Sequence, residues 1–119
     1  MTRTVMVASG TIKDLEAFEV LWKDSVSLVN EREPGTKMYE CYIDKDTSRF
    51  IMHEEYSGDE AIRRHLEVMT ESGVVDRARE VLDFDFVVAL GNPQDQKVRA
   101  AVGDLGFSFY ELHSRAERG

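Results

Sequence analysis

A β-rich stretch with a polar break in its middle stands near the centre of the sequence: KMYECYID-KDTS-RFIMHEEY, from Lys37 to Tyr56. Its two halves, Lys37–Asp44 and Arg49–Tyr56, are rich in Tyr, Ile and Phe, which strands favour. The four residues between them, Lys45–Ser48, are polar, as is typical of a turn. The stretch therefore predicts a β-hairpin, around which the rest of the chain can be arranged.

A strand and a long helix are predicted before the hairpin. Thr4–Gly10 is a short apolar run with β-branched residues, which fits a first strand and is too short for a signal peptide. Apolar residues then recur at the spacing of one helical face, at Leu15, Phe18, Trp22, Val26 and Val29. We expect this helix to end near Glu33, because Pro34 and Gly35 follow it.

The half of the chain after the hairpin repeats the order of helix and strand. Ser57 and Glu60 have the spacing of a capping box, which predicts the start of a helix there. After a break at Ser72-Gly73, a further helix is expected over residues 74–82. A fourth strand is expected to present one apolar face, made of Phe84, Phe86, Val88 and Leu90.

The C-terminal part is predicted to add one helix and one strand. Asn92 and Pro93 resemble a cap followed by proline at the first helical position, with the helix running to about Val102. Phe107–His113 is expected to be a fifth strand. We therefore expect a single domain over residues 1–119, with a core at 4–90, a helix–strand extension at 91–113 and a polar tail at 114–119.

This order of elements predicts an α+β fold of the ferredoxin-like kind, with an antiparallel sheet and helices on one face. Right-handed crossovers place both main helices on the same side of the sheet, so the other face stays bare. Since strands three and four carry apolar side chains toward both faces, the bare face needs a second cover. A second copy of the sheet supplies it, which predicts a homodimer.

The amino-acid composition indicates which kinds of partner this protein does not bind. The net charge of −8 and the interleaving of arginines with acidic residues argue against nucleic acid and against an anionic membrane. No apolar run approaches the roughly 20 residues of a membrane helix. Cys41 is the only cysteine, so no intrachain disulfide can form, and a cytoplasmic protein is expected.

Several motifs, taken in order, resemble the antibiotic biosynthesis monooxygenase (ABM) family over about residues 4–90. They are Trp22 in the first helix, EPG at 33–35, MYECY at 38–42, FIMHEEY at 50–56 and EAIRRHL at 60–66. The resemblance implies a dimeric α+β barrel with a pocket between the sheet and the helices of each subunit. It also implies oxygenation of a phenolic or quinol-like aromatic molecule without metal, flavin or haem. Because other proteins of this fold have different activities or none known, fold alone does not decide function.

The resemblance places Tyr56 and His65 at candidate catalytic positions. Tyr56 closes the third strand, where the family often has a tryptophan facing the pocket; it could stack on an aromatic substrate, or it could be core packing. His65 stands at the histidine of the family's HL motif. It could be the base that forms a phenolate before electron transfer to oxygen, or it could be a buried histidine bonded to backbone.

Further candidates surround this pair. Period-two alternation places Met52, Glu54 and Tyr56 on one face of the third strand. Glu54 could hold one tautomer of His65, act as a base with a raised pKa, or pair with an arginine across the sheet. Arg79 could steer a substrate oxygen or could face solvent. Met52 and Ile62 are candidate substrate contacts; they fall where some active relatives carry polar or aromatic pocket residues.

Other kinds of site are not supported by the sequence. The histidines at 53, 65 and 113 do not have the spacing of metal ligands, and no second cysteine is present, so we expect no metal and no cofactor. Gly103 and Gly106 lack the lysine of a phosphate-binding loop. Two functions remain: a cofactor-free monooxygenase, and a non-catalytic dimeric module that binds a small apolar molecule.

Overall fold

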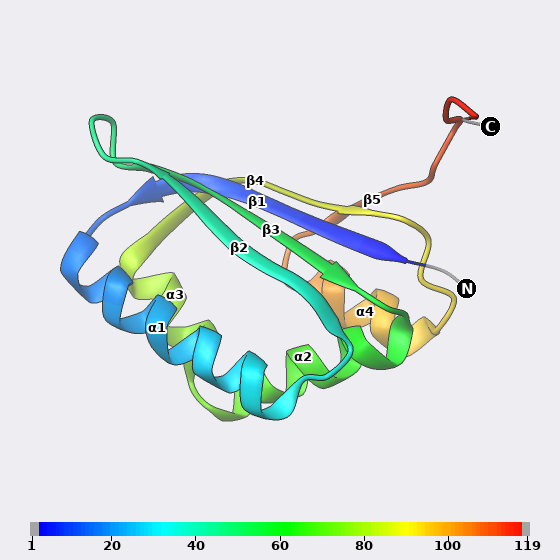
Figure 1. Cartoon of the computed structure of the whole chain (residues 1–119), viewed down its shortest axis with the longest axis horizontal. Coiled ribbons are helices and arrows are strands. Elements are labelled where there is room, and N and C mark those ends of the chain that lie inside the picture. The colour runs from blue at the N-terminus through cyan, green and yellow to red at the C-terminus, as the bar shows by residue number, and fades with distance from the viewer. Residues whose placement is uncertain (1–2, 118–119) are drawn as a thin grey trace.

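The computed structural model of the chain describes residues 3–117 (Figure 1). The elements in chain order are β1 (Thr4–Ile12), α1 (Leu15–Arg32), β2 (Thr36–Asp44), β3 (Arg49–Tyr56), α2 (Asp59–Glu71), α3 (Val74–Val81), β4 (Leu82–Leu90), α4 (Gln96–Asp104) and β5 (Ser108–Tyr110). The predicted hairpin is β2–β3, and its register runs from Thr36 opposite Tyr56 to Asp44 opposite Arg49.

The strands form one sheet in the order β2-β3-β1-β4-β5. The helices lie together on one side of it, and the other side carries none (Figure 1). The predicted ferredoxin-like α+β fold is therefore confirmed. The sheet is mixed rather than antiparallel throughout, because β5 runs parallel to β4.

Helix α1 shows how the sequence fixes a covering element. The Asp14 carboxylate accepts a hydrogen bond from the Ala17 backbone N–H at 3.1 Å and caps the helix. The buried positions of α1 then follow the helical spacing, at Phe18, Leu21, Ser25 and Val29.

In contrast, α2 begins at Asp59 without a side-chain cap, so the predicted Ser57–Glu60 capping box is wrong. Glu60 instead pairs with Arg63 on the same helix.

A bulge between Ser9 and Gly10 changes which faces of β4 are buried. Ser9 lies opposite Phe86, whereas Gly10 lies opposite Phe84, so Asp85 is the extra residue. The predicted common face of Phe84, Phe86, Val88 and Leu90 is therefore wrong. Phe84 turns to the helix side, where its ring meets that of Phe50 edge-on at 5.5 Å between centroids.

The helix α4 begins later than the Asn92-Pro93 pattern predicts. Its cap is Asp95, whose carboxylate accepts bonds from the N–H groups of Lys97 at 2.8 Å and Val98 at 3.1 Å. The preceding residues are held outside the helix, because the Asp59 carboxylate accepts the N–H groups of Gln94 and Asp95 at 2.8 Å.

The fifth strand is also shorter than predicted. Only Ser108–Tyr110 pairs with β4, within its own chain. Gly91, with a φ of 134°, closes this pairing by donating its N–H to the Tyr110 carbonyl at 2.8 Å. Because β4 ends at Leu90, residues 111–113 have no neighbouring strand within residues 3–117 with which to pair.

Deleting residues 104–119 is expected to destabilise the domain. Phe107 and Phe109 pack against the core cluster that contains Met6, Tyr56 and Ile62, and the Arg99 guanidinium lies 4.3 Å from the Phe109 ring centroid. Loss of these contacts should cost about 2–4 kcal/mol, which thermal unfolding would detect. Deleting residues 111–119 is the matched control and should leave the melting temperature nearly unchanged. Equal melting temperatures for the two deletions would contradict a packing role for β5.

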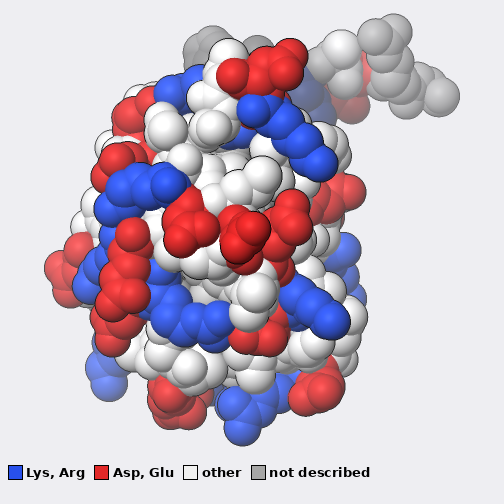
Figure 2. Space-filling model, turned by 90° about the vertical axis from the view of Figure 1, so that its left-hand side faces the viewer, with Lys and Arg blue, Asp and Glu red and all other residues white. Residues whose placement is uncertain are grey.

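Charged side chains of both signs are interspersed on the side of the molecule shown in Figure 2, and neither forms a broad patch there. This matches the interleaving of charges expected from the sequence. Within residues 3–117, no helix has the length and apolar character needed to cross a membrane.

Candidate active site

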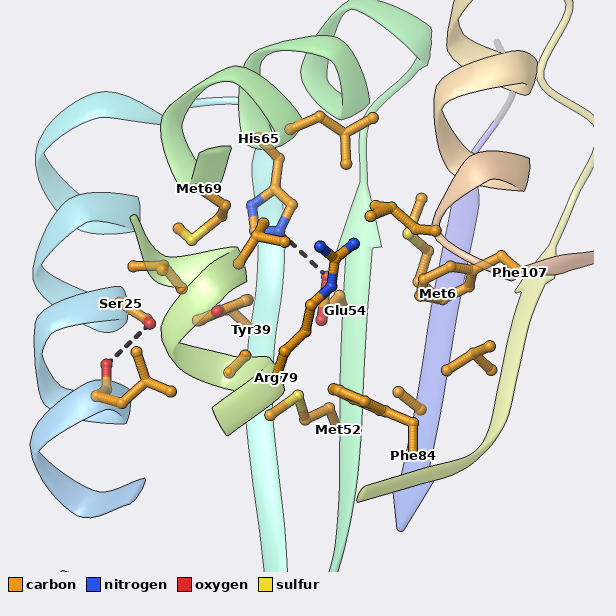
Figure 3. Close-up of a pocket in the computed structure, with 18 of the residues that line it drawn as sticks. Met6, Ser25, Tyr39, Met52, Glu54, His65, Met69, Arg79, Phe84 and Phe107 are labelled. Atoms are coloured by element: carbon orange, nitrogen blue, oxygen red, sulfur yellow. Dashed lines mark hydrogen bonds and ion pairs between the residues drawn. The ribbon is translucent and has the colours of Figure 1, made fainter. Parts of the chain in front are cut away.

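A cavity of about 210 Å³ lies between the sheet and helices α1, α2 and α3. Most of its lining is apolar, with Met6, Phe18, Leu21 and Met52 among the contributors. The hydroxyl, carboxylate, imidazole and guanidinium groups in the lining belong to Ser25, Tyr39, Glu54, His65 and Arg79 (Figure 3). An apolar cavity with a few convergent polar groups is typical of a small-molecule site.

Two polar residues of the cavity lining, Glu54 and His65, belong to a buried chain of titratable side chains. His65 Nδ1 lies 2.7 Å from Glu33 Oε1, and His65 Nε2 lies 3.5 Å from Glu54 Oε1. The Tyr56 hydroxyl donates a hydrogen bond to the same Glu54 oxygen. The imidazole of His65 is therefore placed between two carboxylates, with the Tyr56 ring 5.2 Å away between centroids.

Each member of this chain is placed by its element. Glu54 lies on β3 opposite Met6 of β1 and Tyr39 of β2, so it points to the helix side of the sheet. His65 is on the buried side of α2, together with Ile62 and Met69. Since α2 lies over the end of β3, the imidazole reaches the carboxylate of Glu54 (Figure 3).

Burial and the neighbouring negative charges have opposite effects on the pKa of His65. Burial alone would lower its pKa, but the hydrogen bond to Glu33 and the negative charges of Glu54 and Glu33 outweigh it, so the pKa is raised above 6.5. Burial, followed by the Glu54 charge and hydrogen bond, raises the pKa of Tyr56 well above its usual value. The two carboxylates therefore favour the protonated form of His65, and burial beside Glu54 keeps the Tyr56 phenol neutral.

The two ring nitrogens of His65 face carboxylates, so neither is directed at the cavity as a free acceptor. Glu54 is different. Both of its contacts among residues 3–117 use Oε1, and the side chain lines the cavity. Its other oxygen, Oε2, makes no hydrogen bond or ion pair with residues 3–117. Glu54 is therefore the candidate proton acceptor of the cavity, with the His65 imidazole beside its carboxylate.

The predicted site residues divide into two groups. Glu54, His65, Met52 and Arg79 all line the cavity. Tyr56 and Ile62 do not line the cavity. Both side chains are fully buried in a core cluster that also contains Met6 and Ala89. Tyr56 therefore reaches the site only through Glu54, and stacking of Tyr56 on a substrate is wrong. The Glu54 partners are His65 and Tyr56, so the alternative of an arginine partner across the sheet is also wrong.

Arg79 and Phe84 mark the opening of the cavity. Both line it, yet the Arg79 side chain is 63% exposed and Phe84 is 44% exposed. The nearest acidic group to Arg79 is Asp76, 3.9 Å away on the same helix. At this distance and exposure the pair is weak, so the guanidinium can still contact a ligand at the entrance.

Glu33 was not among the predicted site residues. In the sequence it marks the end of the first helix, and its residue type gives no sign of burial. The structure leaves it 3% exposed and in contact with His65. A buried charge must have a partner, but the partner here is 32 residues away in the sequence, where no local pattern can reveal it.

Within residues 3–117, no group of three or more His, Cys, Asp and Glu side chains is arranged to hold a metal ion. Neither the family models nor the curated proteins contain a match to this chain.

Solved structures do show similarity. MupZ from Pseudomonas fluorescens has a TM-score of 0.81 at 19% identity, covering 99% of this chain and 96% of MupZ. SnoaB, a cofactor-independent oxygenase from Streptomyces nogalater, has a TM-score of 0.65 at 13% identity, covering 81% of this chain and 98% of SnoaB. A Bacteroides thetaiotaomicron protein named as an antibiotic biosynthesis monooxygenase has a TM-score of 0.61 at 15% identity, covering 70% of this chain and 83% of its own.

Identities this low establish the fold and leave the activity open. The family resemblance read from the sequence is confirmed at that level, since structures named for this family align over most of the chain. The chain has the α+β fold of the antibiotic biosynthesis monooxygenases.

Proposed function

We propose that this protein is a cofactor-independent monooxygenase acting on a small phenolic or quinol-like molecule. The observation that supports it most directly is the Glu54–His65 pair in the wall of an otherwise apolar cavity. A phenol must lose its proton before its ring becomes electron-rich enough to reduce oxygen. Glu54 is positioned to accept that proton, and the apolar lining excludes water from the reactive species.

The reaction balances with oxygen as the sole co-reactant. A phenol ring carbon bearing hydrogen becomes a carbonyl, so that phenol plus O₂ gives quinone plus water. The substrate supplies all four electrons that O₂ accepts. The proton taken by Glu54 goes to the outer oxygen of the peroxide on the ring carbon, which gives a hydroperoxide. The O–O bond then breaks as the same ring carbon loses its hydrogen as a proton, so the outer oxygen leaves as hydroxide and combines with that proton to form water. This accounting requires no external reductant.

The cavity size limits the substrate. A volume of about 210 Å³ lies below the ~300–1,000 Å³ of pockets for drug-sized ligands, which favours a molecule of one or two rings. Arg79 at the opening can contact a phenolate or carboxylate oxygen. We therefore propose a small aromatic molecule with one anionic or ionisable group as the ligand.

Oxygen uptake by the metal-free protein with a panel of one- and two-ring phenols and quinols tests this proposal. One O₂ should be consumed for each quinone formed, at a rate proportional to protein concentration. Trp22, the only tryptophan, lines the cavity and reports binding separately through its fluorescence. If members of the panel bind but no oxygen is consumed, the monooxygenase proposal is rejected, and the alternative of a non-catalytic binding module is favoured.

We also propose that the protein is a homodimer joined through the bare face of the sheet. That face exposes large apolar side chains, including Tyr42, Ile51 and Phe86, each at least half exposed. An apolar surface of this kind is unusual on a monomer. A second copy placed on it by a two-fold axis would bury it.

Light scattering should give a mass twice the 13.6 kDa of one chain at micromolar concentration. Replacement of Phe86 by Asp should shift the protein toward monomer, because a charge would be buried at the interface. Val20, equally exposed but on the solvent side of α1, provides the control substitution Val20→Asp. A monomeric wild type at every concentration, or equal effects of both substitutions, would contradict this interface.

A further inference from the structure

Glu33 is a buried acid outside the cavity lining that contacts a lining residue. Its side chain is 1% exposed. Oε1 accepts the Thr36 hydroxyl at 2.8 Å and lies 2.7 Å from His65 Nδ1. Oε2 is buried and has no partner within residues 3–117. A buried carboxylate with one oxygen unpaired is costly, so a role confined to packing would favour an apolar residue here.

The turn that carries Glu33 is docked tightly against α2. Glu33 donates its N–H to the Val29 carbonyl at 3.0 Å and accepts the Thr36 N–H at 3.2 Å. Gly35 allows the close approach, because a Cβ there would lie 2.6 Å from the Cβ of Ala61. Gly35 also accepts the Ser57 N–H at 3.0 Å. The turn therefore holds the carboxylate at a fixed place beside the α2 imidazole.

The groups that face His65 come from every neighbouring element. Glu33 approaches from the turn after α1, and Glu54 and Tyr56 approach from β3. Tyr39 approaches from β2, with its ring 5.6 Å from the imidazole between centroids. The carboxylates are the only charged groups among these. Because Nδ1 of the His65 ring contacts Glu33, the ring nitrogen that faces Glu54 is Nε2.

We infer that Glu33 is a positioning residue, which anchors His65 through Nδ1 and thereby directs Nε2 at the pocket carboxylate Glu54. Its effect on the electrostatics of His65 stands independently of any activity, whereas its effect on turnover rests on the proposed function. Glu33 acts through His65 and does not touch the cavity. This resembles the way an acid can orient a histidine and stabilise its charged form in a catalytic triad.

The test is an NMR titration of the histidine rings in the wild type and in Glu33→Gln. In the wild type, the pKa of His65 should lie above the ordinary value of a histidine, because Glu33 and Glu54 face the ring. In Glu33→Gln the pKa of His65 should fall by roughly 1–3 units, because one of the two facing charges is lost. His53 lies 3.8 Å from Glu40 on the other face of the sheet, so its ring signals provide an internal reference in the same spectra.

The sign of the stability change follows from the raised pKa of His65. The wild type should exceed Glu33→Gln in stability most clearly below pH 6.5, and this advantage should fade as pH rises through the folded-state pKa. Once a substrate is identified, Glu33→Gln should lower kcat with little change in KM, because the cavity lining is intact.

Two results would overturn the inference. One is a wild-type His65 whose pKa is not raised above the ordinary value of a histidine, and this measurement needs no variant to fold. The other is a folded Glu33→Gln protein in which His65 titrates as in the wild type. If Glu33→Gln does not fold, Thr36→Val provides the second variant; it removes the hydroxyl bond that helps hold Glu33 Oε1 beside His65, and a His65 titration unchanged in this variant would contradict the inference. A confirmed titration with no oxygenase activity would keep this inference and reject the proposed function.

Discussion

Replacement of Glu54 by glutamine is expected to lower turnover of a phenolic substrate by about 10²–10⁴-fold, the contribution typical of a positioned base. The amide has nearly the shape of the carboxylate and can still accept the Tyr56 hydroxyl, but it cannot take a proton. Removal of its charge also leaves His65 with Glu33 as its one charged partner. The measurement is kcat by oxygen uptake, with thermal unfolding as a check on folding.

Glu55→Gln is the matched control for this substitution. Glu55 is the next residue of β3 and points to the opposite face, where it pairs with Arg3 at 3.0 Å. The same chemical change there should leave turnover within about twofold, since exposed ion pairs contribute little. Equal losses of turnover in the two variants, or an unchanged kcat in Glu54→Gln, would contradict a proton-accepting role for Glu54.

His65→Ala is a less informative substitution. Two buried acids, Glu33 and Glu54, would lose the imidazole between them, and leaving buried acids without their partner typically destabilises a protein strongly. Stability and activity should therefore fall together in this variant. A loss of activity with stability intact would require a His65 base with one free nitrogen, whereas both of its nitrogens lie beside carboxylates.

The fold could be predicted because its determinants are local. Period-two alternation in β2 and β3, the helical spacing in α1 and the polar turn at 45–48 each act over a few residues. The resemblance to the ABM family then supplied the pocket and the HL histidine. The errors lie where one segment depends on a distant one: the Asp59 carboxylate delays α4, and the bulge opposite Gly10 turns Phe84 inward.

The candidate site was predictable in part for the same reason. Alternation places Glu54 on the helix side of β3, and helical spacing places His65 on the sheet side of α2, so both could be named from the sequence. Whether Tyr56 or Glu33 joins them depends on how α1, α2 and β3 meet. Tyr56 is covered by Ile62 and the core around it, whereas Glu33 is brought to His65 by the tight turn at Gly35.

Gly10→Ala is expected to destabilise the domain by about 3 kcal/mol or more, at the upper end of what overpacking a well-packed interior costs. An added Cβ would lie 1.9 Å from the Asp83 carbonyl oxygen and 2.9 Å from its carbon. Both are backbone atoms, so the contact cannot be relieved by a side-chain rotation. The strands β1 and β4 would have to separate at the bulge, in the centre of the sheet.

Gly103→Ala is the control that separates this clash from the general effect of replacing glycine. Gly103 lies in α4, and the nearest atom to an added Cβ is Phe109 Cε2 at 4.0 Å. Alanine should stabilise the helix there by about 0.5–1 kcal/mol, so the two variants should differ in sign. Chemical denaturation measures both.

The Gly10 substitution should also alter the candidate site, because the same bulge directs Phe84 to the cavity opening. The fluorescence of Trp22, which lines the cavity and stacks on Tyr39 at 4.6 Å between ring centroids, reports such a change in the folded variant. A Gly10→Ala protein with wild-type stability and wild-type Trp22 emission would show that the sheet absorbs the extra methyl group, and that the bulge does not fix the position of Phe84.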